Sequence, residues 1–168
     1  KYYWIWEKEQ GKNFQLVKRQ PLKKTESVCV FYKKTPLYNP QGITKLEKPI
    51  IKSNKGKGGK LEHLSSEKKR KTYIQEFTNY PNNILKFNAE RGFHPTQKPT
   101  KLLEYLIKTY TNEGETVLDN CMGSGSCGIA SINTNRNFIG MELDKDYFKI
   151  SEKRIEEALK NNEKRVSN

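Results

Sequence analysis

Residues 117–128 read VLDNCMGSGSCG and predict a β-strand, a glycine-rich loop and the start of a helix. The loop satisfies the pattern G-x-G-x-x-G through Gly123, Gly125 and Gly128. Glycine lets the backbone turn tightly at the end of a strand and approach a ligand closely, while the following helix offers unpaired N–H groups. An acid, Glu142, ends the next apolar segment, where it can accept hydrogen bonds from ribose hydroxyls. The stretch therefore predicts a nucleoside-binding site.

The segments around this loop alternate between strand and helix patterns. Apolar residues recur at three- and four-residue steps before the loop, and Thr100 stands where a helix cap is expected. Short strand and helix patterns with short connections indicate a parallel, doubly wound sheet and hence an α/β fold. The expected elements are helix 100–110, strand 116–118, helix 127–133, strand 138–142 and helix 146–161.

The N-terminal part has a different character. Residues 1–6 are aromatic and predict a strand, residues 7–12 a polar turn, and residues 27–32 a short buried strand. From about Ile43 to Gly92 no period is sustained and lysine is dense, which predicts a loop-rich basic insertion. A disordered linker is the alternative.

The charge indicates a polyanionic partner. The 168 residues include 32 Lys and Arg against 19 Asp and Glu, a formal net charge of +13. Nucleic acid is the commonest such partner, and a solvated basic surface without a partner is the alternative. No apolar run approaches the roughly 20 residues that span a bilayer, and the three cysteines lack paired-ligand spacing. We therefore expect a cytoplasmic protein without a membrane segment, disulfide or metal site.

The residues around the loop favour one nucleoside cofactor over another. A nicotinamide dinucleotide would place its pyrophosphate at the helix N-terminus, where Asp119 would repel it. S-adenosylmethionine has no phosphate, and its ammonium group suits Asp119. Too few residues follow Glu142 for the further strands of a dinucleotide fold. S-adenosylmethionine is thus the expected cofactor, and a nicotinamide-binding oxidoreductase remains the rival.

Three segments resemble the β-class DNA amino-methyltransferases. They are HPTQKP at 94–99, the loop 119–128 with Asn120-Cys121 in place of the usual Pro-Phe, and FIGMELDKDY at 138–147. Residues 2–8, 18–22 and 26–33 are similar to the stretch that follows the catalytic motif in phage, prophage or restriction-modification members. The resemblance implies a Rossmann-like S-adenosylmethionine-dependent methyltransferase fold, partial and circularly ordered, with an inserted basic target-recognition region. Its parts would be 1–42 in the catalytic sheet, 43–93 for target recognition and 94–168 for cofactor binding.

The resemblance also implies which residues meet the cofactor. Asp119 and the loop backbone would hold its methionine and ribose portions, and Glu142 the ribose. Thr96 and Lys98 would lie near the methionine carboxylate, while a Gly125→Asp change would fill the ligand's space and abolish binding. The full implied set is His94, Thr96, Lys98, Asp119, Asn120, Cys121, Gly123, Ser124, Gly125, Ser126, Glu142, Leu143 and Asp144.

The implied substrate is double-stranded DNA, methylated at an exocyclic amine, with adenine favoured over cytosine on family frequency. Basic residues in and near 43–93 would neutralise phosphates. These are Arg19, Lys23, Lys55, Lys57, Lys60, Lys69, Arg70 and Lys71.

The family's catalytic tetrad is absent from this sequence. It consists of Asp, Asn or Ser, then Pro-Pro, then an aromatic residue, and no two prolines are adjacent here. In the family it precedes the region that matches Tyr2–Lys8, so we expect the chain to supply cofactor and DNA binding without a catalytic residue of its own. A missing N-terminal segment or a split partner chain would carry the tetrad. A non-catalytic DNA-binding remnant is the alternative.

Overall fold

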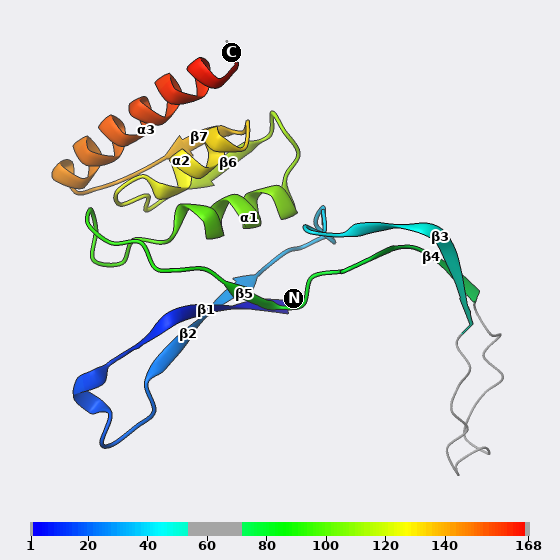
Figure 1. The fold of residues 1–168 in the computed structure, drawn as a ribbon. Helices are drawn as coiled ribbons and strands as arrows, with labels where there is room; N and C mark the ends of the chain where they lie inside the picture. The colour runs from blue at the N-terminus through cyan, green and yellow to red at the C-terminus, as the bar shows by residue number, and fades with distance from the viewer. Residues whose placement is uncertain (1, 54–71, 167–168) are drawn as a thin grey trace. The chain divides into compact units, whose positions relative to one another are not determined.

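The computed structural model describes residues 2–53 and 72–166, which form two units (Figure 1). The first unit comprises residues 1–41 and 82–168, and the second comprises residues 42–81. The first contains the helices and all but two of the described strands. Its elements are β1 (Tyr2–Lys12), β2 (Lys23–Val30), β5 (Ile84–Lys86), α1 (Thr100–Tyr110), β6 (Thr116–Asp119), α2 (Ser126–Asn133), β7 (Asn137–Gly140) and α3 (Lys145–Val166), with a 3-10 turn at Phe14–Leu16.

Strand β1 is the centre of a three-stranded sheet in the order β2-β1-β5. It pairs antiparallel with β2 and parallel with β5. The predicted polar turn at residues 7–12 is wrong, because Glu7 pairs with Thr25 on one side and with Lys86 on the other. Pairing on both sides at Glu7, and pairing of Lys12 with Lys23 on β2 after a register shift, keep this polar segment extended.

Two tryptophans of β1 form the core between this sheet and α1. Trp4 and Trp6 are 3% and 2% exposed and cluster with Leu85 and Leu102. Each indole N–H is satisfied: Trp6 donates to the carbonyl of Phe87 at 2.8 Å and Trp4 to the hydroxyl of Tyr110 at 2.6 Å. Buried indoles usually need such a partner. The aromatic N-terminal pattern therefore reflects a helix-covered strand.

Helix α1 lies where the sequence predicts it, but its cap differs. Thr100 is the first helical residue, and Pro99 occupies the N-cap position without a side-chain cap. Glu90 takes the capping role, accepting hydrogen bonds from the Thr100 N–H at 2.9 Å and from its hydroxyl at 3.0 Å. A carboxylate at a helix N-terminus also interacts favourably with the helix dipole.

Strands β6 and β7 are parallel and adjacent, and helices α2 and α3 complete the strand–helix–strand–helix order that the sequence predicts. The α/β part of the fold prediction is therefore confirmed. Gly128 lets α2 pack closely on its neighbours. A Cβ there would lie 2.6 Å from Cδ1 of Ile155 on α3 and 2.8 Å from Cε1 of Phe138 on β7.

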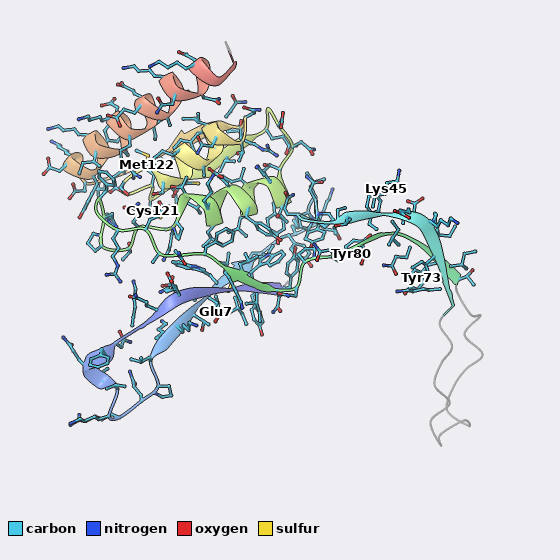
Figure 2. All side chains as sticks on the ribbon, viewed as in Figure 1. Glu7, Lys45, Tyr73, Tyr80, Cys121 and Met122 are labelled. Atoms are coloured by element: carbon cyan, nitrogen blue, oxygen red, sulfur yellow. The ribbon has the colours of Figure 1, made fainter. Side chains whose placement is uncertain are left out.

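The second unit corrects the prediction of a loop-rich insertion. Strands β3 (Thr44–Ser53) and β4 (Thr72–Thr78) form an antiparallel ribbon, with Ile51 opposite Ile74. Lys45 lies on β3 and Tyr73 on β4 (Figure 2). Lysines interrupt the apolar pattern of β3, and Gln75 and Glu76 interrupt that of β4, which is why the sequence shows no sustained period. Strand β5 belongs to the first unit because it pairs with β1, so the second unit ends at Pro81.

Among the described residues, no helix is long and apolar enough to cross a membrane.

Candidate functional site

The glycine-rich loop begins where β6 ends and is held against the end of β7. The N–H of Met141 donates to the carbonyl of Asp119, and the N–H of Met122 to the carbonyl of Met141, both at 2.9 Å. Figure 2 shows Cys121 and Met122 in this loop. Gly123 has a φ of +53° and approaches the ring of His94, which a Cβ there would meet at 3.5 Å. The turn therefore needs glycine for its backbone conformation.

Gly125 serves a different purpose from the one predicted. Its φ is +79°, and a Cβ there would lie 2.9 Å from Cβ and 3.1 Å from Cα of Ser151 on α3. The position therefore faces helix α3. The predicted reason for the effect of Gly125→Asp, a side chain that fills the ligand's space, is wrong, because the added side chain would first collide with the backbone of α3.

Two acids stand at the ends of the paired strands. The carboxylate of Asp119 accepts a hydrogen bond from the N–H of Cys121 at 3.1 Å. Glu142 accepts one from the N–H of Gly123 at 2.8 Å and one from the N–H of Asp144 at 3.0 Å. The bonds from Asp144 and Gly123 lower the pKa of Glu142 below its usual value. Both carboxylates line one cavity.

The HPTQKP segment forms the opposite side of this cavity. His94 Nδ1 accepts a hydrogen bond from the N–H of Thr96 at 3.1 Å, and its ring meets the ring of Tyr147 edge-on at 4.3 Å. Lys98 is partly committed elsewhere, since its Nζ lies 2.8 Å from Glu26 Oε2. The carboxylate of Glu26 on β2 therefore balances the positive charge of Lys98.

Glu26 joins two lysines. Its other oxygen pairs with Lys8, whose side chain is 3% exposed. Burial raises the pKa of Glu26, but the hydrogen bonds and charges of Lys8 and Lys98 outweigh it and lower the pKa to about 2. The carboxylate thus stays ionised and fixes the segment that contains Lys98 to the β1–β2 sheet.

The cavity between these segments has a volume of about 460 Å³, within the roughly 300–1,000 Å³ of small-molecule sites. Most of the predicted cofactor residues line it: His94, Thr96, Lys98, Asp119, Cys121, Gly123, Ser124, Ser126 and Glu142. Four predicted residues are not among the lining residues: Asn120, Gly125, Leu143 and Asp144. Leu143 is 97% exposed, and the carboxylate of Asp144 caps α3 by accepting from the N–H groups of Asp146 and Tyr147.

Other residues line the cavity although no motif assigned them to the site. They are Gln97, Leu103, Met122 and Cys127. Gln97 lies inside HPTQKP and Met122 inside the loop, so membership of these motifs could have predicted that both residues line the cavity. Leu103 carries no signal beyond its helical spacing.

Ser126 and Cys127 begin helix α2 at the bottom of the cavity. Ser126 is 5% exposed, and within the described part of the chain its hydroxyl has no hydrogen-bond partner. A buried polar group without a partner costs free energy, so this hydroxyl is suited to a bound polar group. Burial, together with the charge and hydrogen bond of Asp119, raises the pKa of the Cys127 thiol to about 12.

The predicted DNA contacts are only partly within the described residues. Arg19 and Lys23 are both exposed. Arg19 lies between strands β1 and β2, and Lys23 is the first residue of β2. Lys55, Lys57, Lys60, Lys69, Arg70 and Lys71 lie outside the described residues. Across residues 2–53 and 72–166, no group of three or more His, Cys, Asp or Glu side chains is arranged to hold a metal ion.

Comparison with known proteins identifies the family. The sequence profile of a family described as DNA methylase, the N6/N4 methyltransferases, matches residues 2–153. The chain belongs to this family. The N6/N4 methylases depend on S-adenosylmethionine, so the predicted amino-methyltransferase family and the predicted cofactor are confirmed, while membership of the β-class stays a prediction. Which residues bind the cofactor stays a prediction.

Two curated relatives illustrate the sequence match. The type II methyltransferase M2.DpnII of Streptococcus pneumoniae is 48% identical over 65 residues, 39% of this chain and 24% of that protein. The DNA adenine methyltransferase YhdJ of Escherichia coli is 37% identical over 84 residues, 46% of this chain and 29% of that protein. The matched residues thus span about a quarter of the length of these relatives.

Two solved structures share the fold. The complex of M1.HpyAVI with S-adenosylmethionine is 30% identical with a TM-score of 0.56, covering 92% of this chain and 60% of that one. The cytosine-N4-specific PvuII methyltransferase is 16% identical with a TM-score of 0.61, covering 95% of this chain and 56% of that one. The second likeness shows the fold alone.

Proposed function

We propose that the cavity between HPTQKP and the glycine-rich loop binds S-adenosylmethionine, and that this chain forms the donor-binding and DNA-binding part of a DNA amino-methyltransferase. The observation that carries the proposal is that the carboxylates of Asp119 and Glu142 line the same cavity as the Ser126 hydroxyl, which has no hydrogen-bond partner among the described residues. The charge balance favours a cationic ligand, because Lys98 on the opposite wall is paired with Glu26. A pyrophosphate would meet two carboxylates at close range.

Each chemical group of the donor has a proposed partner among the residues of this chain. Glu142 would accept hydrogen bonds from the ribose hydroxyls, and Asp119 would hold the ammonium group. Leu143, which is almost fully exposed, and Asp144 would border the adenine. Thr96 and Lys98 would lie near the methionine carboxylate. When bound, S-adenosylmethionine supplies an electrophilic methyl group, and the chain's own residues orient it.

For the acceptor we propose double-stranded DNA, with the 6-amino group of adenine favoured over the 4-amino group of cytosine. A relative named as a DNA adenine methyltransferase supports adenine, and the net charge of +13 supports DNA. The base must be extruded from the duplex before its amine can reach the methyl group. Because the lone pair of such an amine is delocalised into the base, the amine must also be aimed at the methyl group. We propose that residues outside the 168 printed here carry the polar acceptor and the stacking ring, acting as part of the same protein or as a partner chain.

Equilibrium binding tests the donor assignment. Calorimetric titration of the chain with S-adenosylmethionine, its demethylated product and NADH should give binding of the first two and none of NADH. Glu142→Gln should weaken donor binding about tenfold, because an amide is a poorer acceptor for ribose hydroxyls than a carboxylate. The matched control is Glu113→Gln, on the exposed turn between α1 and β6. Tight NADH binding without S-adenosylmethionine binding would contradict the proposal.

DNA binding is tested separately by its salt dependence. The slope of log K against log salt reports the number of phosphates neutralised, at about 0.9 per contact on duplex DNA. Replacing Arg19 and Lys23 with Gln should reduce the slope if both meet phosphates, and an unchanged slope would exclude them. Methylation mapping of DNA from cells that carry the full-length gene would identify the target base and sequence.

A further inference from the structure

One side chain of helix α3 contacts both the glycine-rich loop and the residue that precedes HPTQKP. The guanidinium of Arg154 donates a hydrogen bond to the backbone carbonyl of Ser124 in the glycine-rich loop. The same guanidinium lies over the ring of Phe93, with its Cζ 4.2 Å from the ring centroid. Phe93 directly precedes the HPTQKP segment, so Arg154 bridges two segments that are far apart in the sequence.

The surroundings of Arg154 hold it in this position. Burial lowers the pKa of its guanidinium, while the charges of Glu90 and Glu157 oppose that effect. Glu90 is itself fixed, since its carboxylate accepts hydrogen bonds from Thr100 and from Gln97. A planar guanidinium can stack on an aromatic ring and donate in its own plane at the same time, which lysine cannot do.

Helix α3 touches the HPTQKP segment a second time. Tyr147 lies about two helical turns before Arg154, and its ring packs edge-on against His94. Residues at this spacing share a helix face. The cavity wall formed by His94, Thr96, Gln97 and Lys98 is therefore joined to α3 through Tyr147 and, at the preceding residue Phe93, through Arg154. The loop that carries Gly123 and Ser124 meets α3 through Arg154 and through the close approach of Gly125 to Ser151.

We propose that Arg154 is a positioning residue that fixes the two walls of the cavity at the separation the donor requires, and so sets donor affinity without contacting the donor. This inference rests on the proposed function. Without the guanidinium, the carbonyl of Ser124 loses its donor and the ring of Phe93 loses its cation. The walls then have to be ordered when the ligand binds, and that ordering reduces affinity.

The test measures donor affinity and stability together. In calorimetric titrations with S-adenosylmethionine, Arg154→Met should bind about tenfold more weakly or worse, as expected for the loss of a charged hydrogen bond. Arg154→Lys should recover part of the affinity because it keeps one donor. The matched control is Arg136→Met. Arg136 is 9% exposed and donates hydrogen bonds to Thr111 and Thr134. None of these three residues lines the cavity.

The control separates positioning from general destabilisation. Arg136→Met should lower the melting temperature but leave donor affinity within about twofold of the unchanged chain, provided both variants are folded at the titration temperature. Phe93→Leu should also weaken binding, and combining it with Arg154→Met should cost less than the sum of the two single changes. This pair keeps the test decisive if Arg154→Met does not fold, since Phe93→Leu and Arg154→Lys are milder.

The results distinguish this inference from the proposed function. Donor binding by the unchanged chain together with unaltered affinity in Arg154→Lys, Arg154→Met and Phe93→Leu would overturn the role of Arg154 alone. Equal losses of affinity in Arg154→Met and Arg136→Met would also overturn it. Failure of the unchanged chain to bind S-adenosylmethionine would overturn the proposed function, and this inference with it.

Discussion

The carboxylate of Glu142 accepts a hydrogen bond of 2.8 Å from the backbone N–H of Gly123. This bond ties the residue that follows β7 to the loop that follows β6, so the acid expected to meet ribose also fixes the shape of the loop. A carboxylate oxygen has two lone pairs, so the same group can accept a sugar hydroxyl without releasing Gly123. In the proposed site, donor binding and loop geometry would therefore be coupled through this one side chain.

Ser126→Ala should separate binding from stability. The buried hydroxyl of Ser126 has no partner among the described residues, so its removal should leave the melting temperature unchanged or slightly higher. Donor affinity should fall several-fold if this hydroxyl meets the ligand. Calorimetry and thermal unfolding of the same preparations measure both.

The control for Ser126 is another buried serine on the same helix. Ser131 is fully buried, and its hydroxyl donates to the carbonyl of Cys127 at 2.8 Å. Ser131→Ala should leave donor affinity unchanged. If Ser126→Ala also leaves it unchanged, the hydroxyl plays no part in the site.

Gly125→Ala should destabilise the chain more than Gly114→Ala. Both glycines have nearly the same φ, +79° and +80°, but a Cβ at Gly114 meets nothing within 4 Å, whereas one at Gly125 collides with Ser151. The shared backbone cost is about 1 kcal/mol, and overpacking adds roughly 1–3 kcal/mol at Gly125. Urea unfolding of the two variants measures the difference, and equal losses would show that α2 and α3 are not packed at this point.

Cys127 should react with alkylating reagents far more slowly than Cys29 and Cys121. The thiolate is the reactive form, and with a pKa of about 12 roughly one Cys127 thiol in ten thousand is ionised at pH 8. Cys29 and Cys121 are exposed. Mass spectrometry after timed iodoacetamide treatment measures each site, and Asp119→Asn should speed the reaction at Cys127. Labelling of Cys127 as fast as Cys29 would contradict the burial described for it.

The ion pairs of Glu26 should make stability depend on pH. The pKa of Glu26 is about 2 in the folded chain, whereas the ordinary value that applies to the unfolded chain is 4.5. A lowered carboxyl pKa stabilises the folded state above the unfolded value, and this contribution is lost as pH falls from about 4.5 toward 2. At pH 7, Glu26→Gln should therefore be less stable than the unchanged chain, and the difference should shrink below pH 4.5. Urea unfolding across this range checks it, and a constant difference would exclude the pairing.

The region from residue 100 onward follows closely from its sequence because local pattern and tertiary packing agree there. Apolar spacing predicts α1, and the glycine pattern predicts the strand–loop–helix unit around Asp119. Long-range pairing explains where the prediction fails. The segment 7–12 is extended because Glu7 pairs with strands on both sides and Lys12 pairs with β2. Lysines on β3 and polar residues on β4 conceal the pairing of those two strands.

The site can likewise be divided into features that local sequence motifs predict and features that depend on long-range packing. The motifs predict most of the residues that line the cavity, because each motif places its backbone there. They do not predict which way an added Cβ points at Gly125, nor that Arg154 on a highly charged helix turns inward to Ser124. Both facts depend on how α3 packs against α2 and the loop. No local pattern encodes that contact.

Backbone amide NMR during titration with S-adenosylmethionine tests the central claim most directly. If the cavity holds the donor, the largest shift changes in a ¹⁵N–¹H spectrum should fall on the amides of Gly123, Ser124, Ser126 and Glu142, with further changes at Thr96 and Lys98. The amides of β3 and β4 should not move. Shift changes confined to residues outside the cavity, or none at saturating S-adenosylmethionine, would contradict the account.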